Sequence, residues 1–118
     1  MEAIWEKARE VGRLVAQTEE YQALRRANTL LSEDREAVAR LTRLGELEQG
    51  FTAALQQGEA PPPAEQEEYE RLAGELQGSA TYRGFAVAQD AFERLMARIQ
   101  EEIGRGIQAG EQSRIILA

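Results

Sequence analysis

Hydrophobic residues recur every three or four positions along most of this chain, and the longest such run lies between residues 79 and 107. Steps of three and four place side chains on one face of an α-helix, so the run predicts one long helix with an apolar stripe. Ser79 is expected to cap its first turn, because a serine hydroxyl can accept a hydrogen bond from an unpaired backbone N–H. A helix of this length cannot bury its stripe alone and needs other helices, from this chain or from a second copy. The stripe comprises Tyr82, Phe85, Gln89, Phe92, Met96, Ile99 and Ile103.

The same periodicity predicts four more helices before residue 79. The first covers residues 2–17, and the second follows a break at Thr18, whose hydroxyl can cap it. A third helix begins after Ser32 or Asp34, either of which can be the cap, and runs to about residue 57. Three consecutive prolines at 61–63 cannot continue a helix, and a fourth helix is expected over about 64–77. The third and fourth helices are expected to form an antiparallel hairpin.

Among the stripe positions that carry residues other than apolar ones, two allow more than one interpretation. Gly45, in the third helix, either lets another helix approach closely or simply lowers helix stability, and we favour the second interpretation. Asn28, in the second helix, is interpreted as a register-setting residue or as a packed edge position.

These patterns predict an all-α fold: a five-helix bundle with long antiparallel helices and a long C-terminal helix that self-associates, most readily as a dimer. We expect one helical domain over residues 1–108 and a C-terminal tail over 109–118 with an apolar end. Docking of this tail on the domain or on a dimer partner is favoured, with a partner-binding tail and disorder as alternatives. The candidate dimer or partner interface comprises Phe85, Phe92, Met96, Ile99, Ile103, Ile115, Ile116 and Leu117.

Composition restricts the chemistry that this chain can perform. Among 118 residues there is no cysteine and no histidine, which excludes thiolate chemistry and removes the commonest general base and metal ligand. We therefore expect no cofactor, no metal and no enzymatic activity. The net charge of −7 argues against binding to nucleic acid, and no apolar run is long enough to span a membrane. With no signal-peptide pattern at the start, a cytoplasmic protein is expected.

Two other functions are alternatives to a protein-binding role. Arg94, Arg98 and Arg105 share one face of the last predicted helix, so an RNA-binding accessory protein is the alternative function. Interleaved carboxylates make this face more typical of a surface covered by ion pairs. An enzyme using glutamate-bound magnesium is the third hypothesis, but the glutamates surround their helices and do not converge on a pocket.

Short landmarks along the chain resemble the YlbF/YmcA family of small helical bacterial proteins, which includes YheA-type members. The junction at residues 18–21, Thr-Glu-Glu-Tyr, is similar to the family's Ser-x-Glu-Tyr. Residues 31–37, Leu-Ser-Glu-Asp-Arg-Glu-Ala, resemble its Leu-x-x-Asp-x-Glu-Ala start of a long helix, and residues 82–103 resemble its closing helix. The resemblance covers about residues 4–107.

The resemblance implies an all-α protein that self-associates, often as a dimer, and acts by binding other proteins. Relatives regulate competence, biofilm formation and sporulation, and are linked to mRNA processing by the endoribonuclease RNase Y. The implied partner is a paralogous helical protein or an RNA-processing nuclease. Some relatives work in an assembly with cysteine-ligated iron–sulfur clusters, to which this chain can supply no ligand because it has no cysteine.

Overall fold

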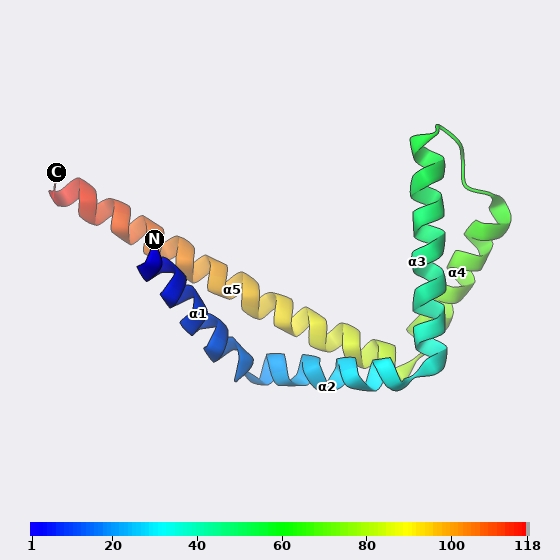
Figure 1. The fold of residues 1–118 in the computed structure, drawn as a ribbon, viewed down its shortest axis with the longest axis horizontal. Helices are drawn as coiled ribbons and strands as arrows, with labels where there is room; N and C mark the ends of the chain where they lie inside the picture. The colour runs from blue at the N-terminus through cyan, green and yellow to red at the C-terminus, as the bar shows by residue number, and fades with distance from the viewer. Residues whose placement is uncertain (118) are drawn as a thin grey trace. The chain divides into compact units, whose positions relative to one another are not determined.

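The computed structural model describes the backbone of residues 1–117 and the side chains of residues 1–112. The all-α fold class, with five helices and a long C-terminal helix, is confirmed over that range, whereas self-association stays a prediction. The helices are α1 (Glu2–Ala16), α2 (Glu19–Glu33), α3 (Arg35–Gln56), α4 (Pro63–Gln77) and α5 (Ala80–Leu117) (Figure 1).

The helix starts agree with the caps expected from the sequence. Thr18 Oγ1 accepts a hydrogen bond from the backbone N–H three residues later, at 3.2 Å. Asp34, rather than Ser32, caps α3 in the same way, at 3.2 Å. Ser79 Oγ accepts the corresponding bond at the start of α5, at 3.4 Å. Each side chain pairs a backbone N–H that the first helical turn leaves without a partner.

The expected end of the last helix at residue 107 is wrong, because α5 continues to Leu117. Three glycines between residues 104 and 110 suggested a break, since each lowers helix stability by about 1 kcal/mol relative to alanine. Ion pairs one turn apart oppose this effect on the same stretch, with Arg98 bonded to Glu102 and Arg105 bonded to Glu101. The proposed boundary between a domain and a tail at residue 108 stays a prediction.

Residue contacts divide the chain into two compact units, which are described separately. Unit 1 contains Met1–Leu24 and the chain from Ala88 on, and unit 2 contains Arg25–Val87. Unit 1 therefore comprises α1, the start of α2 and most of α5. Unit 2 comprises the rest of α2, the hairpin of α3 and α4, and the first turns of α5.

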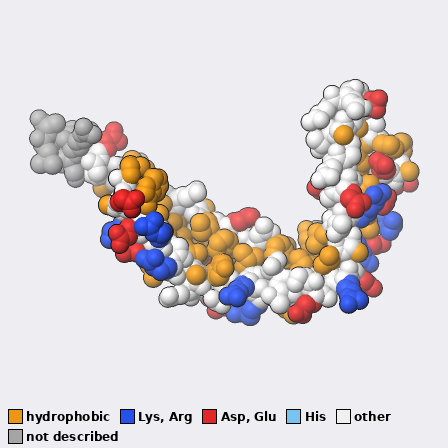
Figure 2. All heavy atoms as spheres, viewed as in Figure 1, with side chains coloured by type: hydrophobic (Ala, Val, Ile, Leu, Met, Phe, Trp, Pro, Cys, Tyr) orange, Lys and Arg blue, Asp and Glu red, His pale blue; other side chains and the backbone are white. Residues whose placement is uncertain are grey.

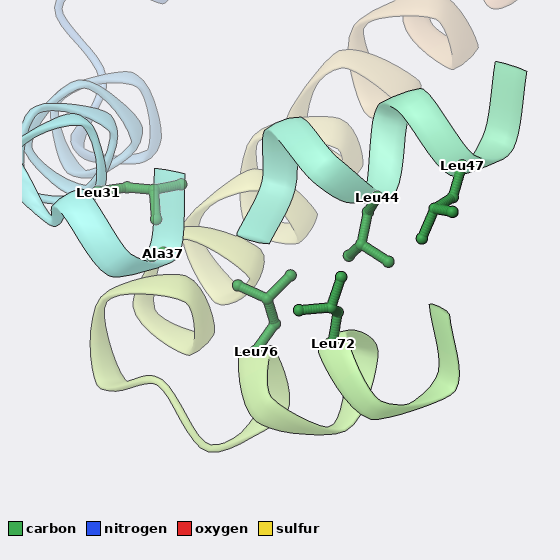
Figure 3. Close-up of a cluster of buried hydrophobic side chains, with 6 residues drawn as sticks. All are labelled: Leu31, Ala37, Leu44, Leu47, Leu72 and Leu76. Atoms are coloured by element: carbon green, nitrogen blue, oxygen red, sulfur yellow. The ribbon is translucent and has the colours of Figure 1, made fainter. Parts of the chain in front are cut away.

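The main apolar core belongs to unit 2 and lies largely between α3 and α4. The two helices run antiparallel, as predicted, since Arg40 pairs with Glu75 while Arg43, further along α3, pairs with Glu68, earlier in α4. Phe51 and Tyr69 extend the core towards the hairpin tip, with ring centroids 5.7 Å apart. The buried side chains of this core are Leu31, Ala37, Leu44, Leu47, Leu72 and Leu76 (Figure 3).

The connection between α3 and α4 depends on glycine and proline. Gly58 has φ of +73°, a conformation that side chains with a Cβ rarely adopt, and it turns the chain away from the end of α3. Pro63 then occupies the first turn of α4, where a missing backbone N–H costs no helical bond.

The two ambiguous stripe residues lie at open positions. A Cβ on Gly45 would meet no atom within 4 Å, so no other helix of unit 2 approaches closely there. This agrees with the favoured interpretation that Gly45 only lowers helix stability. Asn28 is exposed, so no packed position for it is seen. Within residues 1–117, no helix is both long enough and apolar enough to cross a bilayer.

Candidate docking face of unit 1

Unit 1 pairs two amphipathic helices that leave apolar surface uncovered. Helix α1 runs antiparallel to α5, since Ile4 and Val11 share a groove with Ile103 while Val15 and Tyr21 share another with Phe92. No residue of α1 is buried, although hydrophobic and polar side chains are sharply segregated around this helix. An isolated helix of this length is marginally stable in water, so α1 depends on what it packs against.

Two open grooves follow the line between α1 and α5. The first has a volume of about 400 Å³ and is lined by Ala3, Ile4, Lys7, Ala8, Val11 and Ile103. The second, of about 340 Å³, contains Gly12, Val15, Tyr21, Phe92 and Met96 and shares Ala8 and Val11 with the first. Because the two grooves share lining residues, together they extend along nearly the whole of α1.

Large apolar side chains around these grooves remain exposed to solvent, as Figure 2 shows along α1 and α5. Leu14 is 66% exposed, Ile107 65%, Ile4 57% and Ile103 56%. Soluble proteins rarely leave so many neighbouring apolar side chains in water unless a partner covers them. We call this surface the α1–α5 face, defined by Ile4, Val11, Leu14, Met96, Ile103 and Ile107.

The sequence did not single out the α1 half of this face. The predicted interface residues all lie on the last helix, whereas Ile4, Val11 and Leu14 of α1 are also exposed. A usable signal was present in the width of the apolar arc on α1. Ala8 and Val15 lie on one side of Val11, and Leu14 lies on the other, so the arc is wider than one neighbouring helix can cover.

The predicted interface residues are divided between the two units. Phe85 packs against the core of unit 2, whereas Phe92 lies in unit 1 with its ring centroid 6.0 Å from that of Tyr21. Met96 and Ile103 line the two grooves. Ile99 is half-buried. The side chains of the remaining three candidates lie outside the described residues: Ile115, Ile116 and Leu117.

The arginines proposed for RNA contact are engaged by carboxylates of the same helix. Arg94 pairs with Asp90 at 2.8 Å, and Arg98 pairs with Glu102 at 2.9 Å. Arg105 lies 3.2 Å from Glu101 and also within ion-pair distance of Glu102. An RNA phosphate would have to compete with these neighbours, which weakens the case for a nucleic-acid surface.

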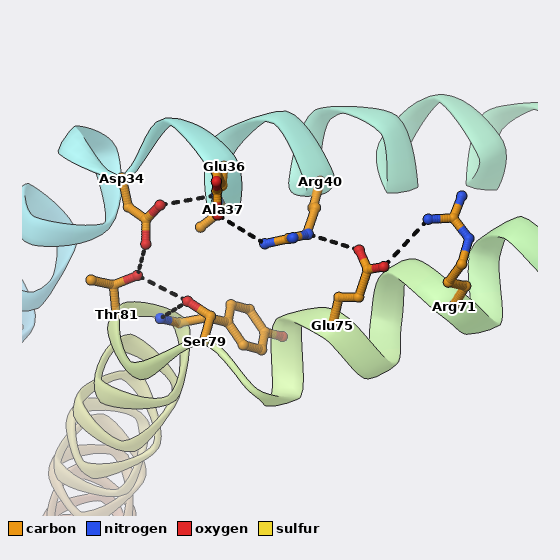
Figure 4. Close-up of polar contacts among 9 residues, drawn as sticks. Asp34, Glu36, Ala37, Arg40, Arg71, Glu75, Ser79 and Thr81 are labelled. Carbon is orange, nitrogen blue, oxygen red and sulfur yellow. Dashed lines mark hydrogen bonds and ion pairs between the residues drawn. The ribbon is translucent and has the colours of Figure 1, made fainter.

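Unit 2 contains a polar network that ties its helix junctions together (Figure 4). The Asp34 carboxylate caps α3 and also accepts a hydrogen bond from the Thr81 hydroxyl, at 2.6 Å. That hydroxyl lies 3.1 Å from Ser79 Oγ. The hydrogen bond from Thr81 is the main reason that the pKa of Asp34 lies below its ordinary value of 3.8, with the Ala37 N–H contributing next. The network holds the start of α3 against the start of α5.

Ion pairs between α3 and α4 add to this network. Arg43 donates two hydrogen bonds to Glu68, of 2.6 and 3.1 Å, which lower the pKa of that glutamate. The Arg40 side chain lies 2.9 Å from Glu75 and likewise lowers its pKa. The described side chains include no cluster of three or more carboxylates arranged to hold a metal ion. The clearest feature of the described surface is the exposed apolar α1–α5 face.

Comparison with known proteins identifies relatives over most of the chain. Residues 4–108 match a family profile described as "Control of competence regulator ComK, YlbF/YmcA". A UPF0342 protein of Streptococcus mutans serotype c is 30% identical over 88 residues, which is 75% of this chain and 78% of that protein.

A solved structure shares the fold. It matches with a TM-score of 0.73 and 17% sequence identity over 90% of this chain and 94% of its counterpart. It is described as the crystal structure of Bacillus subtilis RicA in complex with RicF.

Proposed function

The chain belongs to the YlbF/YmcA family, and from this premise we propose that it is a non-enzymatic regulator that binds other helical proteins. The observation that carries the proposal is the α1–α5 face, where α1 buries no residue and neighbouring large apolar side chains stay exposed. A regulator that works by docking needs such a surface, whereas an enzyme needs convergent reactive groups. The absence of cysteine and histidine from the sequence favours the first of these roles.

The proposed partner is a paralogous helical protein of the same family. Support comes from the related fold of Bacillus subtilis RicA, which was crystallised in complex with RicF. An amphipathic helix from such a protein would fill the grooves between α1 and α5 through apolar anchors spaced three and four residues apart. Control of an RNA-processing nuclease, which the family resemblance implies, is a further proposed consequence of this binding.

Affinity purification of the tagged chain from its native cell extract tests the proposal, with and without RNase and with identification by mass spectrometry. Leu14→Gln is the test variant, because Leu14 is 66% exposed on the α1–α5 face. Leu55→Gln is the matched control, because Leu55 is 68% exposed but belongs to unit 2.

The proposal expects a family paralogue or an RNA-processing nuclease to be recovered by the wild-type chain and by the control variant, with RNase present. Leu14→Gln should lose that partner. Recovery that depends on intact RNA, or equal recovery with both variants, would contradict docking through this face.

A further inference from the structure

The larger of the two grooves on the α1–α5 face contains one charged side chain, that of Lys7. The other described residues that line this groove are apolar: Ala3, Ile4, Ala8, Val11 and Ile103. Lys7 is also the only lysine among the 118 residues, whose other cationic side chains are all arginine. The Lys7 side chain is 79% exposed, so its ammonium group lies in water while the groove is empty.

The Lys7 ammonium group is weakly engaged within its own chain. Its ion pair is with Glu10, one turn away on α1, and the nitrogen–oxygen distance of 3.7 Å is too long for a hydrogen bond. An ammonium group has three N–H donors, and none of those of Lys7 is bonded to a described residue. Because an exposed ion pair of this kind contributes little to stability, the group is available for a stronger partner.

A helix that fills this groove takes the Lys7 ammonium group out of water. A charge that loses its water without gaining a partner is strongly unfavourable. A carboxylate on the incoming helix balances the charge and accepts short hydrogen bonds from the ammonium group. A helix that offers only apolar or basic side chains at that position leaves the ammonium group unpaired and is rejected.

We propose that Lys7 selects the helical partner of the α1–α5 face by pairing with a carboxylate of that partner. The apolar anchors supply most of the buried area, and the charge pair determines which helix is accepted and in what register. The occupant is therefore an amphipathic helix with an Asp or Glu beside its apolar stripe, placed to meet Lys7. This inference rests on the proposed function, because it names the chemistry by which the proposed partner is recognised.

The single lysine allows a site-specific test by cross-linking with a carbodiimide, which joins an amine directly to a carboxylate that touches it. Lys7 supplies the only side-chain amine of the 118 residues, and mapping of the linked peptides separates it from the terminal amino group. The tagged full chain is loaded with partner from its native cell extract, washed, treated with carbodiimide and analysed by mass spectrometry. The expected product joins Lys7 to an Asp or Glu of the paralogous protein.

Charge variants of the full chain measure how much the pair contributes to binding. Lys7→Glu should lower recovery of the paralogous protein at least about tenfold, because it places two carboxylates together. Lys7→Arg keeps the positive charge and should retain the partner, but it has no amine and should lose the cross-link. Arg9→Glu is the matched control, since it makes the same charge change on the opposite side of α1, and it should bind as wild type does. Circular dichroism checks that every variant remains helical.

Two results would overturn the inference and leave the proposed function intact. One is equal recovery of the paralogous protein by wild type and Lys7→Glu, which would mean that the ammonium group stays in water at the edge of the groove. The other is a set of cross-links that joins Lys7 only to carboxylates of this chain. Absence of a paralogous protein from the wild-type sample would contradict the proposed function, and this inference with it. The two failures are thus distinguishable.

Discussion

The two units of this protein differ in how much apolar surface they bury between their own helices. Unit 2 buries six apolar side chains between its own helices and ties those helices with hydrogen bonds and ion pairs. In unit 1, Ala88 is the only buried residue among those described, and α1 buries none. The comparison indicates that unit 2 is held together mainly by its own contacts, whereas unit 1 leaves apolar surface exposed, which we propose that another chain covers.

Truncation of a core leucine should produce the largest difference between the units. Leu76 is 2% exposed in unit 2, so Leu76→Ala is expected to lower the free energy of unfolding by about 2–5 kcal/mol. Leu14→Ala in unit 1 should change the free energy of unfolding of the monomer by no more than about 0.5 kcal/mol. Urea unfolding followed by circular dichroism measures both. Equal losses would mean that unit 1 has a core of its own.

Removal of the Asp34 carboxylate should have the next largest effect. Asp34→Ala removes the cap of α3 and the partner of Thr81 together, so the melting temperature should fall by several degrees. Thr81→Val keeps the cap and removes only the second bond, and it should cause a smaller fall. A melting temperature unchanged by Asp34→Ala would show that the network does not stabilise unit 2.

The same carboxylate predicts the direction of a pH effect. Because folding lowers the pKa of Asp34, its contribution to stability is fully present above the ordinary value of 3.8 and is lost as the pH falls through the lowered folded-state pKa. The difference in melting temperature between wild type and Asp34→Ala should therefore be constant near neutral pH and shrink under acid conditions. A difference that grows on acidification would contradict the assignment.

A smaller effect is expected for the ion pairs on the hairpin. Glu68→Gln removes the charge and leaves one acceptor oxygen in place of the two that now receive bonds from Arg43, but both side chains are partly in contact with solvent. The melting temperature should fall less than for Asp34→Ala. Added salt should reduce the difference in melting temperature between Glu68→Gln and wild type. A difference that does not respond to salt would indicate that packing, not charge, is lost.

The smallest effect on folding is expected on the α1–α5 face. Leu14→Gln should leave the unfolding curve of the monomer almost unchanged, because Leu14 is already 66% exposed. Its effect should appear in self-association, measured by sedimentation, where Leu55→Gln is the matched control in unit 2. A loss of monomer stability with no change in self-association would mean that Leu14 stabilises the fold of its own chain and does not contact a second one.

Local patterns in the sequence were enough to predict the helices and their caps. Thr18 and Ser79 cap the helices that the spacing of apolar residues predicted, and Asp34 was one of two candidates for the third cap. The predicted end of the last helix is wrong because the glycine content indicates a break, whereas ion pairs along the same helix oppose it. Signals within one helix can oppose each other, and their balance is hard to read from composition.

Side-chain contacts between residues far apart in the sequence could not be predicted from it. The bond from Thr81 to Asp34 joins residues 47 positions apart, and no periodic pattern encodes it. The long stripe of the last helix looked continuous, yet Phe85 belongs to unit 2 and Phe92 to unit 1. The contribution of α1 to the docking face followed only once its side chains were seen to be exposed. A single helix pattern does not reveal which neighbour covers which part of it.

Hydrogen exchange of α1, measured by mass spectrometry in dilute and concentrated solution, tests the central claim most directly. If another chain completes unit 1, amides of residues 2–16 should exchange rapidly when the protein is dilute and slow markedly when it is concentrated. Amides of α3 and α4 should be protected to the same extent in both. Protection of α1 that equals that of α3 and α4 in dilute solution, and does not change with concentration, would contradict the claim.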